Sequence, residues 1–225
     1  MDSSIDRALC ALIDHTLLRP DAVGADIDRL CQEARAFGFR TVCVQPVFVA
    51  RAACNLAGSP VGVSAVVAFP HGAATTAAKA FETRRALDDG ATEIDVVANL
   101  GWIAADTAAD DGRLTDEVAR IVDTAAGAPV KVILECALFS DARKEAAARA
   151  VVAARAASVK TSTGYGPGGA TVHDVALLRR VVGADTGVKA SGGIKTRALA
   201  QALVAAGASR IGASASIALV TLPHR

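Results

Sequence analysis

Residues 130–163, VKVILECALFSDARKEAAARAVVAARAASVKTST, contain the repeating unit that predicts the fold. A β-branched run at 130–136 (VKVILEC) and another at 158–163 (SVKTST) lie on either side of an alanine-rich segment. Short apolar runs are typical of buried strands, and the longer segment between them is typical of a helix. A strand, a helix and a second strand in this order form a parallel pair with a right-handed crossover. This stretch therefore predicts one unit of a parallel α/β fold.

The same unit recurs along the rest of the chain. Six more apolar runs lie at 12–17 (LIDHTL), 41–45 (TVCVQ), 61–68 (VGVSAVVA), 93–98 (EIDVVA), 187–191 (GVKAS) and 210–214 (RIGAS). The segments between runs have apolar residues at helical spacing. Many of them end at a glycine that can adopt positive φ: Gly38, Gly58, Gly90, Gly127, Gly183 and Gly207.

Eight strand and helix units are the number that closes a parallel sheet into a barrel. We therefore predict a single (βα)8 domain of the TIM-barrel type over residues 1–225, with a short helix at the N-terminus. An open doubly wound sheet is the structural alternative, but no G-x-G-x-x-G motif follows the early strands. The polar segment at 105–113 (ADTAADDGR) predicts a loop.

Composition limits the classes of partner. The chain has 52% hydrophobic residues and a formal net charge of +1, which predicts a large core and no general attraction for nucleic acid or acidic lipid. Five cysteines without a C-x-x-C pair indicate reduced thiols. The acidic N-terminus and the absence of about 18 consecutive apolar residues argue against a signal peptide or a membrane span. We expect a cytoplasmic protein with a small-molecule partner.

Two lysines are predicted to face the barrel interior. Side chains alternate across a strand, so outward Val159 places Lys160 inside, and outward Val188 places Lys189 inside. One interior lysine is explained by a salt bridge, but two on adjacent strands about 4.8 Å apart repel by roughly 3 to 4 kcal/mol at an effective dielectric of about 20. One amine would then be largely uncharged near pH 7, as a nucleophile requires.

The same alternation places further charged side chains inside the barrel. Asp95, Lys131 and Glu135 are inward on their strands, and Asp14 is a further candidate on the first strand. Each one alone is explained by a barrel-filling ion pair. Together they indicate a polar site suited to proton transfer.

Small residues follow the last two strands. Gly192 and Gly193 come after the seventh run, and Gly212 and Ser214 lie at the end of the eighth. A single Gly-Gly pair is explained by a simple turn. Its recurrence at these two loops of a barrel, each ahead of a helix, predicts a phosphate site made by backbone N–H groups.

Seven segments together resemble the deoxyribose-phosphate aldolase family over nearly the whole chain. They are LIDHTLL (12–18), TVCVQP (41–46), GATEIDVVANLG (90–101), KVILEC (131–136), VKTSTGYGPGGAT (159–171), GVKASGGIKT (187–196) and RIGASAS (210–216). The resemblance implies reversible cleavage of 2-deoxy-D-ribose 5-phosphate to acetaldehyde and D-glyceraldehyde 3-phosphate, without a metal or another cofactor. Pairing of two barrels in a homodimer stays open.

The resemblance also implies residue roles. It makes Lys160 the Schiff-base lysine, Lys189 the cation that depresses its pKa, and Asp95 the acid and base that works with water. Lys131 and Asp14 match a supporting polar network. Cys43 matches a pocket-lining cysteine, although the residues alone favour a buried structural thiol. The histidines, His15, His71, His173 and His224, form no convincing metal-ligand cluster in the sequence.

The chain departs from the family in three places. The segment 153–159 (AARAASV) lacks the glycine that usually precedes the Schiff-base strand, the chain ends in TLPHR without a tail tyrosine, and Tyr165 stands beside the site.

Two other functions remain as alternatives. A transaldolase or keto-deoxy-sugar aldolase would share the lysine chemistry but not the second lysine in GVKASGG, and a silent phosphosugar sensor would lack Lys160 or Asp95.

Overall fold

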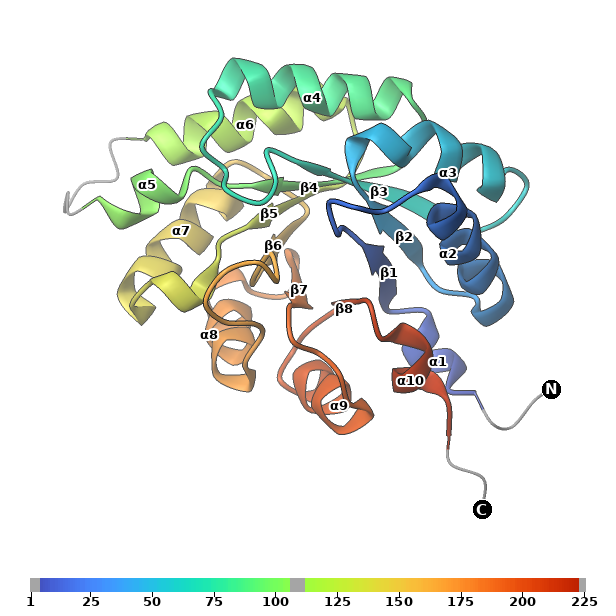
Figure 1. The fold of residues 1–225 in the computed structure, drawn as a ribbon. Coiled ribbons are helices and arrows are strands. Elements are labelled where there is room, and N and C mark those ends of the chain that lie inside the picture. Colours follow the sequence, from blue (N-terminus) through green and yellow to red (C-terminus); the bar gives the residue numbers. More distant parts are fainter. Residues whose placement is uncertain (1–4, 106–111, 223–225) are drawn as a thin grey trace.

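Eight parallel strands form a closed barrel in the order of the sequence (Figure 1). The structure is a computed structural model that describes residues 5–105 and 112–222. The strands are β1 (Ile13–Leu17), β2 (Thr41–Val44), β3 (Gly62–Val67), β4 (Glu93–Val97), β5 (Val130–Ile133), β6 (Ser158–Lys160), β7 (Gly187–Ser191) and β8 (Arg210–Ala213). The predicted TIM barrel is confirmed. The open sheet is ruled out because β8 pairs with β1, with Ile211 beside Ile13.

Helices follow the strands and surround the barrel (Figure 1). They are α1 (Arg7–Cys10), α2 (Gly24–Phe37), α3 (Val49–Leu56), α4 (Thr76–Asp88), α5 (Leu100–Ala104), α6 (Arg113–Ala125), α7 (Asp141–Ala153), α8 (Val172–Val182), α9 (Arg197–Ala205) and α10 (Ser216–Val220). Two 3-10 turns, η1 (Pro46–Phe48) and η2 (Cys136–Leu138), follow β2 and β5. The short N-terminal helix is confirmed as α1, and a bridge between Ile5 and Thr221 joins the two ends of the described chain.

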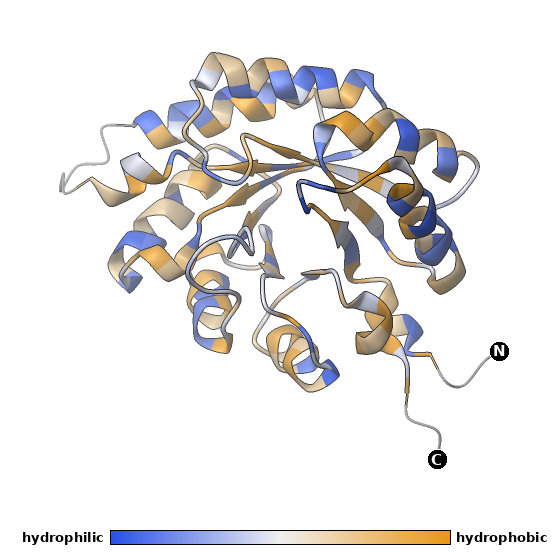
Figure 2. Ribbon diagram, in the orientation of Figure 1, coloured by the Kyte–Doolittle hydropathy of each residue, from blue (hydrophilic) through white to orange (hydrophobic). Residues whose placement is uncertain are grey.

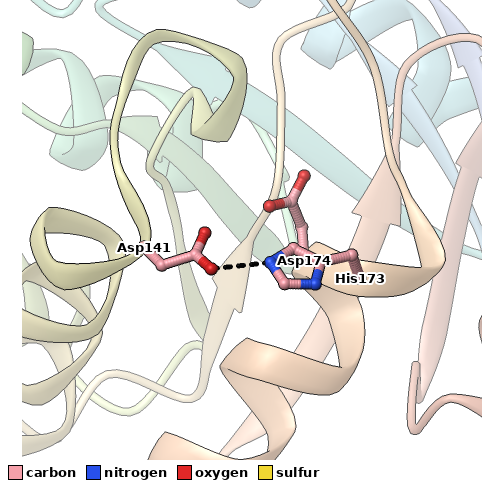
Figure 3. Close-up of side chains that lie close together, drawn as sticks. All are labelled: Asp141, His173 and Asp174. Carbon is pink, nitrogen blue, oxygen red and sulfur yellow. Dashed lines mark hydrogen bonds and ion pairs between the residues drawn. The ribbon is translucent and has the colours of Figure 1, made fainter.

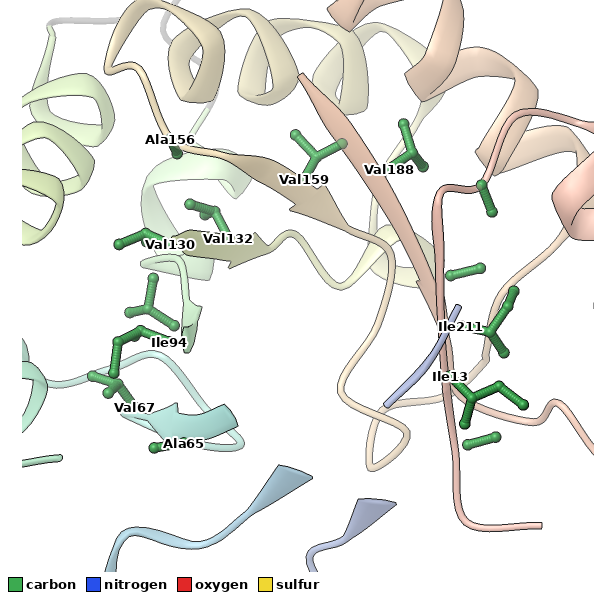
Figure 4. Packing of buried hydrophobic residues seen from close by; sticks show 14 of the residues in the cluster. Ile13, Ala65, Val67, Ile94, Val130, Val132, Ala156, Val159, Val188 and Ile211 are labelled. Atoms are coloured by element: carbon green, nitrogen blue, oxygen red, sulfur yellow. The ribbon is translucent and has the colours of Figure 1, made fainter. Parts of the chain in front are cut away.

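The main apolar core lies between the strands and the helices. Outward residues of neighbouring strands, including Val132, Val159 and Val188, are fully buried there (Figure 4). Burying one such side chain stabilises the fold by about 1.5–3 kcal/mol. Figure 2 shows the strands as largely hydrophobic and the helices as mixed, with hydrophilic stretches. Because the outward positions supply this core, the inward positions are free to carry polar groups.

Strands β5 and β6 are shorter than predicted. They end at Ile133 and Lys160 instead of residues 136 and 163. In the first case Glu135 adopts a left-handed backbone (φ 52°) and leads into η2. In the second case the backbone N–H of Ser191 donates to the Thr161 hydroxyl at 3.1 Å, so a side chain replaces the next carbonyl of the ladder.

The junction without glycine keeps the strand register. Arg155 adopts the left-handed conformation (φ 58°) that a glycine takes more readily, and Lys160 still pairs with Lys189 across β6 and β7. The six predicted helix-ending glycines all have positive φ. The loop expected at 105–113 falls mostly on residues 106–111, which lie outside the described residues, as do residues 223–225 of the TLPHR ending. Within the described ranges, no helix combines the length and the apolar character that a membrane span requires.

Candidate active site

The barrel interior holds a layer of charged side chains supplied by five strands and the first position of β8. They are Asp14, Glu93, Asp95, Lys131, Lys160, Lys189 and Arg210. Six of them are buried, and the side chain of Arg210 is 14% exposed. Charges removed from water in this way are tolerated only when they are paired.

Asp95 lies at the centre of this layer. Its Oδ2 accepts hydrogen bonds from Lys160 Nζ and Lys189 Nζ, each at 2.6 Å. Its Oδ1 accepts from Lys131 Nζ at 2.7 Å and from the hydroxyl of Ser64 at 2.9 Å. Both oxygens therefore have two donors, and the carboxylate is held in one orientation between the two lysines that the sequence placed inside the barrel.

The ion pairs continue from Asp95 into a closed ring. On one side, Lys189 also pairs with Asp14. On the other side, Lys131 pairs with Glu93 at 2.7 Å. Arg210 contacts both Asp14, at 2.9 Å, and Glu93, and so completes the ring. Lys160 is attached to this ring through Asp95.

The two lysines have opposite protonation tendencies. Burial lowers the pKa of the Lys160 amine; the Lys189 ammonium acts in the same direction, and the Asp95 carboxylate acts against both. Burial also disfavours the charged form of Lys189, but the carboxylates of Asp14 and Asp95 outweigh it and raise the pKa of Lys189. The sequence analysis named Lys189 as the cause of a lowered Lys160 pKa, whereas burial is the larger cause in the structure.

The carboxylates remain ionised despite burial. Burial would raise the pKa of Asp95, but Lys131, Lys160 and Lys189 lower it well below its usual range. The pKa of Asp14 falls to about 2 because the cations around it, with Lys189 the strongest, outweigh burial. The site therefore combines fixed anions with one amine that is poised to lose its proton.

Two of the sequence-predicted polar residues lie apart from this contact network. Cys43 is buried with Leu18 and Val66, and burial, with Asp95 nearby, raises the pKa of its thiol. Glu135 does not join the charged layer, so its predicted position was wrong. Its left-handed backbone instead turns the carboxylate to Thr163, whose N–H donates to Oε2 at 3.2 Å and whose hydroxyl also donates to it.

A cavity of about 350 Å³ opens above Lys160 at the carboxyl ends of the strands. All of the residues predicted to bind phosphate line it: Gly192, Gly193, Gly212 and Ser214. Arg19 and Lys195 also line the cavity, and sequence reasoning missed both. Two cations beside two small-residue loops form an environment that favours an anion.

Backbone approach explains why glycine is needed at this rim. Gly192 has φ +86°, and a Cβ added at Gly169 would lie 2.3 Å from the carbonyl oxygen of Gly192. The N–H of Ala170 donates to the same oxygen at 3.0 Å. The loop after β6 therefore packs directly on the turn after β7, and the two together form one wall of the cavity.

The sequence reasoning also missed Glu93 and Arg210, although the signal was present. Glu93 lies two residues before Asp95 and Arg210 lies two residues before Gly212, so each shares the inward face of its strand. Both stand at the first position of a strand, and their side chains keep 10% and 14% exposure.

The histidines lie away from the lysine layer where they are described; His224 lies outside the described residues. His71 is exposed. His15 is buried between Glu33 and Ser216, with its Nε2 and Nδ1 at 2.8 and 2.9 Å from their oxygens.

One group among the described residues has the spacing of metal ligands, namely Asp141, His173 and Asp174 on α7 and α8 (Figure 3). Lys144 already pairs with both carboxylates, at 3.1 Å to Asp141 and 2.7 Å to Asp174. Asp141 also contacts His173 at 2.7 Å. These contacts describe an ion-pair network that joins two outer helices, and the group lies outside the barrel.

A parallel barrel with paired buried lysines below a glycine-lined cavity has the architecture of a lysine-dependent aldolase. Residues 8–219 match the DeoC/LacD family aldolase, and the chain belongs to this family. The deoxyribose-phosphate aldolase of Bacillus subtilis (strain 168) is 49% identical over 214 residues, or 95% of each chain. That of Coprothermobacter proteolyticus is 50% identical over 210 residues, 93% of this chain and 94% of the relative. A structure described as tetrameric deoxyribose phosphate aldolase from Aeropyrum pernix has a TM-score of 0.87 at 35% identity, covering 95% of this chain and 89% of that one.

Proposed function

We propose that this aldolase reversibly cleaves 2-deoxy-D-ribose 5-phosphate to acetaldehyde and D-glyceraldehyde 3-phosphate through a Schiff base on Lys160. The observation that carries the proposal is the buried Lys160 amine, whose pKa is lowered and which lies 2.6 Å from Asp95 beneath the cavity. The relatives named deoxyribose-phosphate aldolase, at 47–50% identity over nearly the whole chain, support the substrate.

The first step forms the iminium. The uncharged amine of Lys160 attacks the C1 carbonyl of the open-chain sugar, and the resulting carbinolamine loses its hydroxyl as water. Asp95, with a water molecule as carrier, passes the proton that the amine loses to the carbinolamine oxygen. A second proton, taken from solvent, lets this oxygen leave as water, and it is released again when the last iminium is hydrolysed. Lys189 remains charged and holds Asp95 in place, since the pKa of Lys189 is raised.

The second step breaks the C2–C3 bond. The proton of the C3 hydroxyl leaves to the water held by Asp95, and the bonding electrons move into the iminium to give an enamine at C1 and C2. Glyceraldehyde 3-phosphate then departs. The enamine takes a proton at C2, and hydrolysis of the iminium consumes the water released earlier and liberates acetaldehyde. The iminium supplies the electron sink, so the proposed route needs no metal.

The roles of the remaining residues follow from their contacts. Asp14 and Lys131 hold the ends of the Lys189 and Asp95 side chains and form the supporting network. The phosphate is proposed to bind at the loops that contain Gly192, Gly193, Gly212 and Ser214. Cys43 is proposed to be a structural thiol beside the site, because it is fully buried.

Reductive trapping tests the proposal. Incubation with acetaldehyde and borohydride should leave an alkyl adduct on Lys160, identified by peptide mass spectrometry, and deoxyribose 5-phosphate should compete with its formation. Lys79 is the matched control, because it is equally buried and pairs with Glu117 outside the barrel. Release of glyceraldehyde 3-phosphate from deoxyribose 5-phosphate gives the activity. Active enzyme with an unmodified Lys160 would remove the mechanism.

Assembly and location remain predictions. The sequence left a homodimer open, and the relative from Aeropyrum pernix is described as a tetramer. We propose a homo-oligomer that acts on phosphosugars in the cytoplasm, without nucleic acid or membrane partners. Sedimentation equilibrium of the purified chain would measure the assembly, and a monomer at micromolar concentration would contradict it.

A further inference from the structure

The ring of ion pairs inside the barrel is balanced in charge. Its anions are Asp14, Glu93 and Asp95, and its cations are Lys131, Lys189 and Arg210. Each anion of the ring therefore has one cation to match it. Lys160 is the remaining titratable group of the layer, and its carboxylate partner, Asp95, is shared with two ring cations. A protonated Lys160 would leave the layer with an excess positive charge.

We infer that Glu93 and Arg210, which take no step in the reaction, set this charge balance and thereby keep the amine of Lys160 uncharged. They are positioning residues that act through the ring. The inference rests on the proposed function, since it concerns the same nucleophile. It adds two residues that influence the protonation of Lys160 from the opposite end of the barrel strands to the substrate cavity.

Arg210 is the member of the ring whose charge stays constant. It donates from Nε to Asp14 at 3.0 Å and from Nη2 to both Asp14, at 2.9 Å, and Glu93. A guanidinium does not lose its proton in a protein, so Arg210 cannot offset a change in the net charge of the layer by deprotonation. Lys189 is held charged by two carboxylates. Lys160 is therefore the group that responds when the number of charges changes.

Two cations, Arg19 and Lys195, line the cavity that opens above Lys160. The other charged or titratable groups around it in the described structure come from the barrel. Those on the other strands of the barrel are Asp14 on β1, Cys43 on β2, Glu93 and Asp95 on β4, Lys131 on β5, Lys189 on β7 and Arg210 on β8. Strand β3 contributes the neutral Ser64. Cys43 is kept as a thiol because burial raises its pKa. Glu135, beyond β5, is engaged by Thr163.

Removing one charge from either partner should move the Lys160 titration in opposite directions. Glu93→Gln leaves the ring one positive charge in excess, which lowers the pKa of Lys160. Arg210→Met leaves one negative charge in excess, which raises it. At two strand spacings, about 10 Å, and an effective dielectric of about 20, one unit charge shifts a pKa by about one unit. A purely structural role would give losses of the same sign.

The test measures the rate of acetaldehyde and borohydride trapping at Lys160 as a function of pH. The acid limb of this profile should move about one pH unit down in Glu93→Gln and about one unit up in Arg210→Met. In the Glu93→Gln and Arg210→Met double variant it should return to the wild-type position. Arg210→Lys, which keeps the charge, should leave the limb in place.

The outcomes separate the two proposals. Glu93→Gln alone tests the inference if Arg210→Met does not fold. Glutamine keeps a hydrogen-bond acceptor for Lys131 and Arg210 while it removes the charge. Suppose that the wild-type protein forms the adduct on Lys160. The inference is then overturned if the acid limb of Glu93→Gln does not move, or if the limbs of both variants move in the same direction. The proposed function is unaffected by either result. Absence of the wild-type adduct on Lys160 in active enzyme defeats the proposed function itself.

Discussion

Replacing Lys189 by methionine tests the electrostatic coupling on which the proposed chemistry depends. The Nζ atoms of Lys160 and Lys189 each lie 2.6 Å from Asp95 Oδ2, so they are separated by no more than twice that distance. Two ammonium groups about 5 Å apart at an effective dielectric of about 20 repel by about 3 kcal/mol, or about two pKa units. Removing the Lys189 charge should therefore raise the pKa of Lys160 by about two units.

The expected kinetic result is a displaced pH profile. The acid limb of kcat/KM, which reports the uncharged amine of the free enzyme, should move about two units upward. Activity below the limb should fall about 100-fold and should recover toward the wild-type level at high pH. Asp14 retains Arg210 as a partner, and Asp95 retains Lys131, so neither carboxylate is left without a cation.

A stability control separates this effect from damage to the fold. Breaking a buried ion pair costs about 3–5 kcal/mol, so thermal unfolding of each variant is measured first. Lys79→Met removes a lysine that is 0% exposed and lies 2.7 Å from Glu117, outside the barrel. It should lower stability without moving the pH profile. The reasoning is refuted if Lys189→Met loses activity equally at every pH, or if its acid limb stays in place.

Three further predictions concern the rim, the acid stability and the electron sink. Gly192→Ala places a side chain at φ +86° and 3.1 Å from Gly169 Cα. In steady-state assays, KM for deoxyribose 5-phosphate should therefore rise about 10-fold or more, while KM for unphosphorylated deoxyribose stays the same. Equal changes for both sugars would contradict a phosphate site. The Asp14 carboxyl has a pKa of about 2 against an ordinary 3.8, so it contributes about 2 kcal/mol that is fully present above about pH 4 and is lost as the pH falls through about 2; acid titrations of the unfolding free energy should be shallower in Asp14→Asn, and equal slopes would speak against this contribution. Dialysis against a chelator should leave turnover unchanged, and a loss that added metal restores would argue against the iminium as the sole electron sink.

Strand alternation predicted the interior of the site well because it depends only on local backbone geometry. Apolar Val159 and Val188 fix the outward face of their strands, and Lys160 and Lys189 must then point inward. The sequence could not tell which carboxylate meets which amine. That pairing depends on the stagger between strands that closes the barrel, and this stagger brings Asp95 on β4 between lysines on β6 and β7.

The alternation rule fails where a strand stops, and Glu135 shows the reason. Two residues after Ile133 the backbone turns left-handed, so the carboxylate that parity places inside the barrel binds Thr163 instead. Arg155 shows the reverse case, because a non-glycine residue takes a left-handed turn and the register of Lys160 survives. Neither conformation is the one that its residue type favours. Sequence reasoning is therefore strongest within the strands, where the charges of the ring lie, and weakest at their carboxyl ends, where the loops that line the substrate cavity begin.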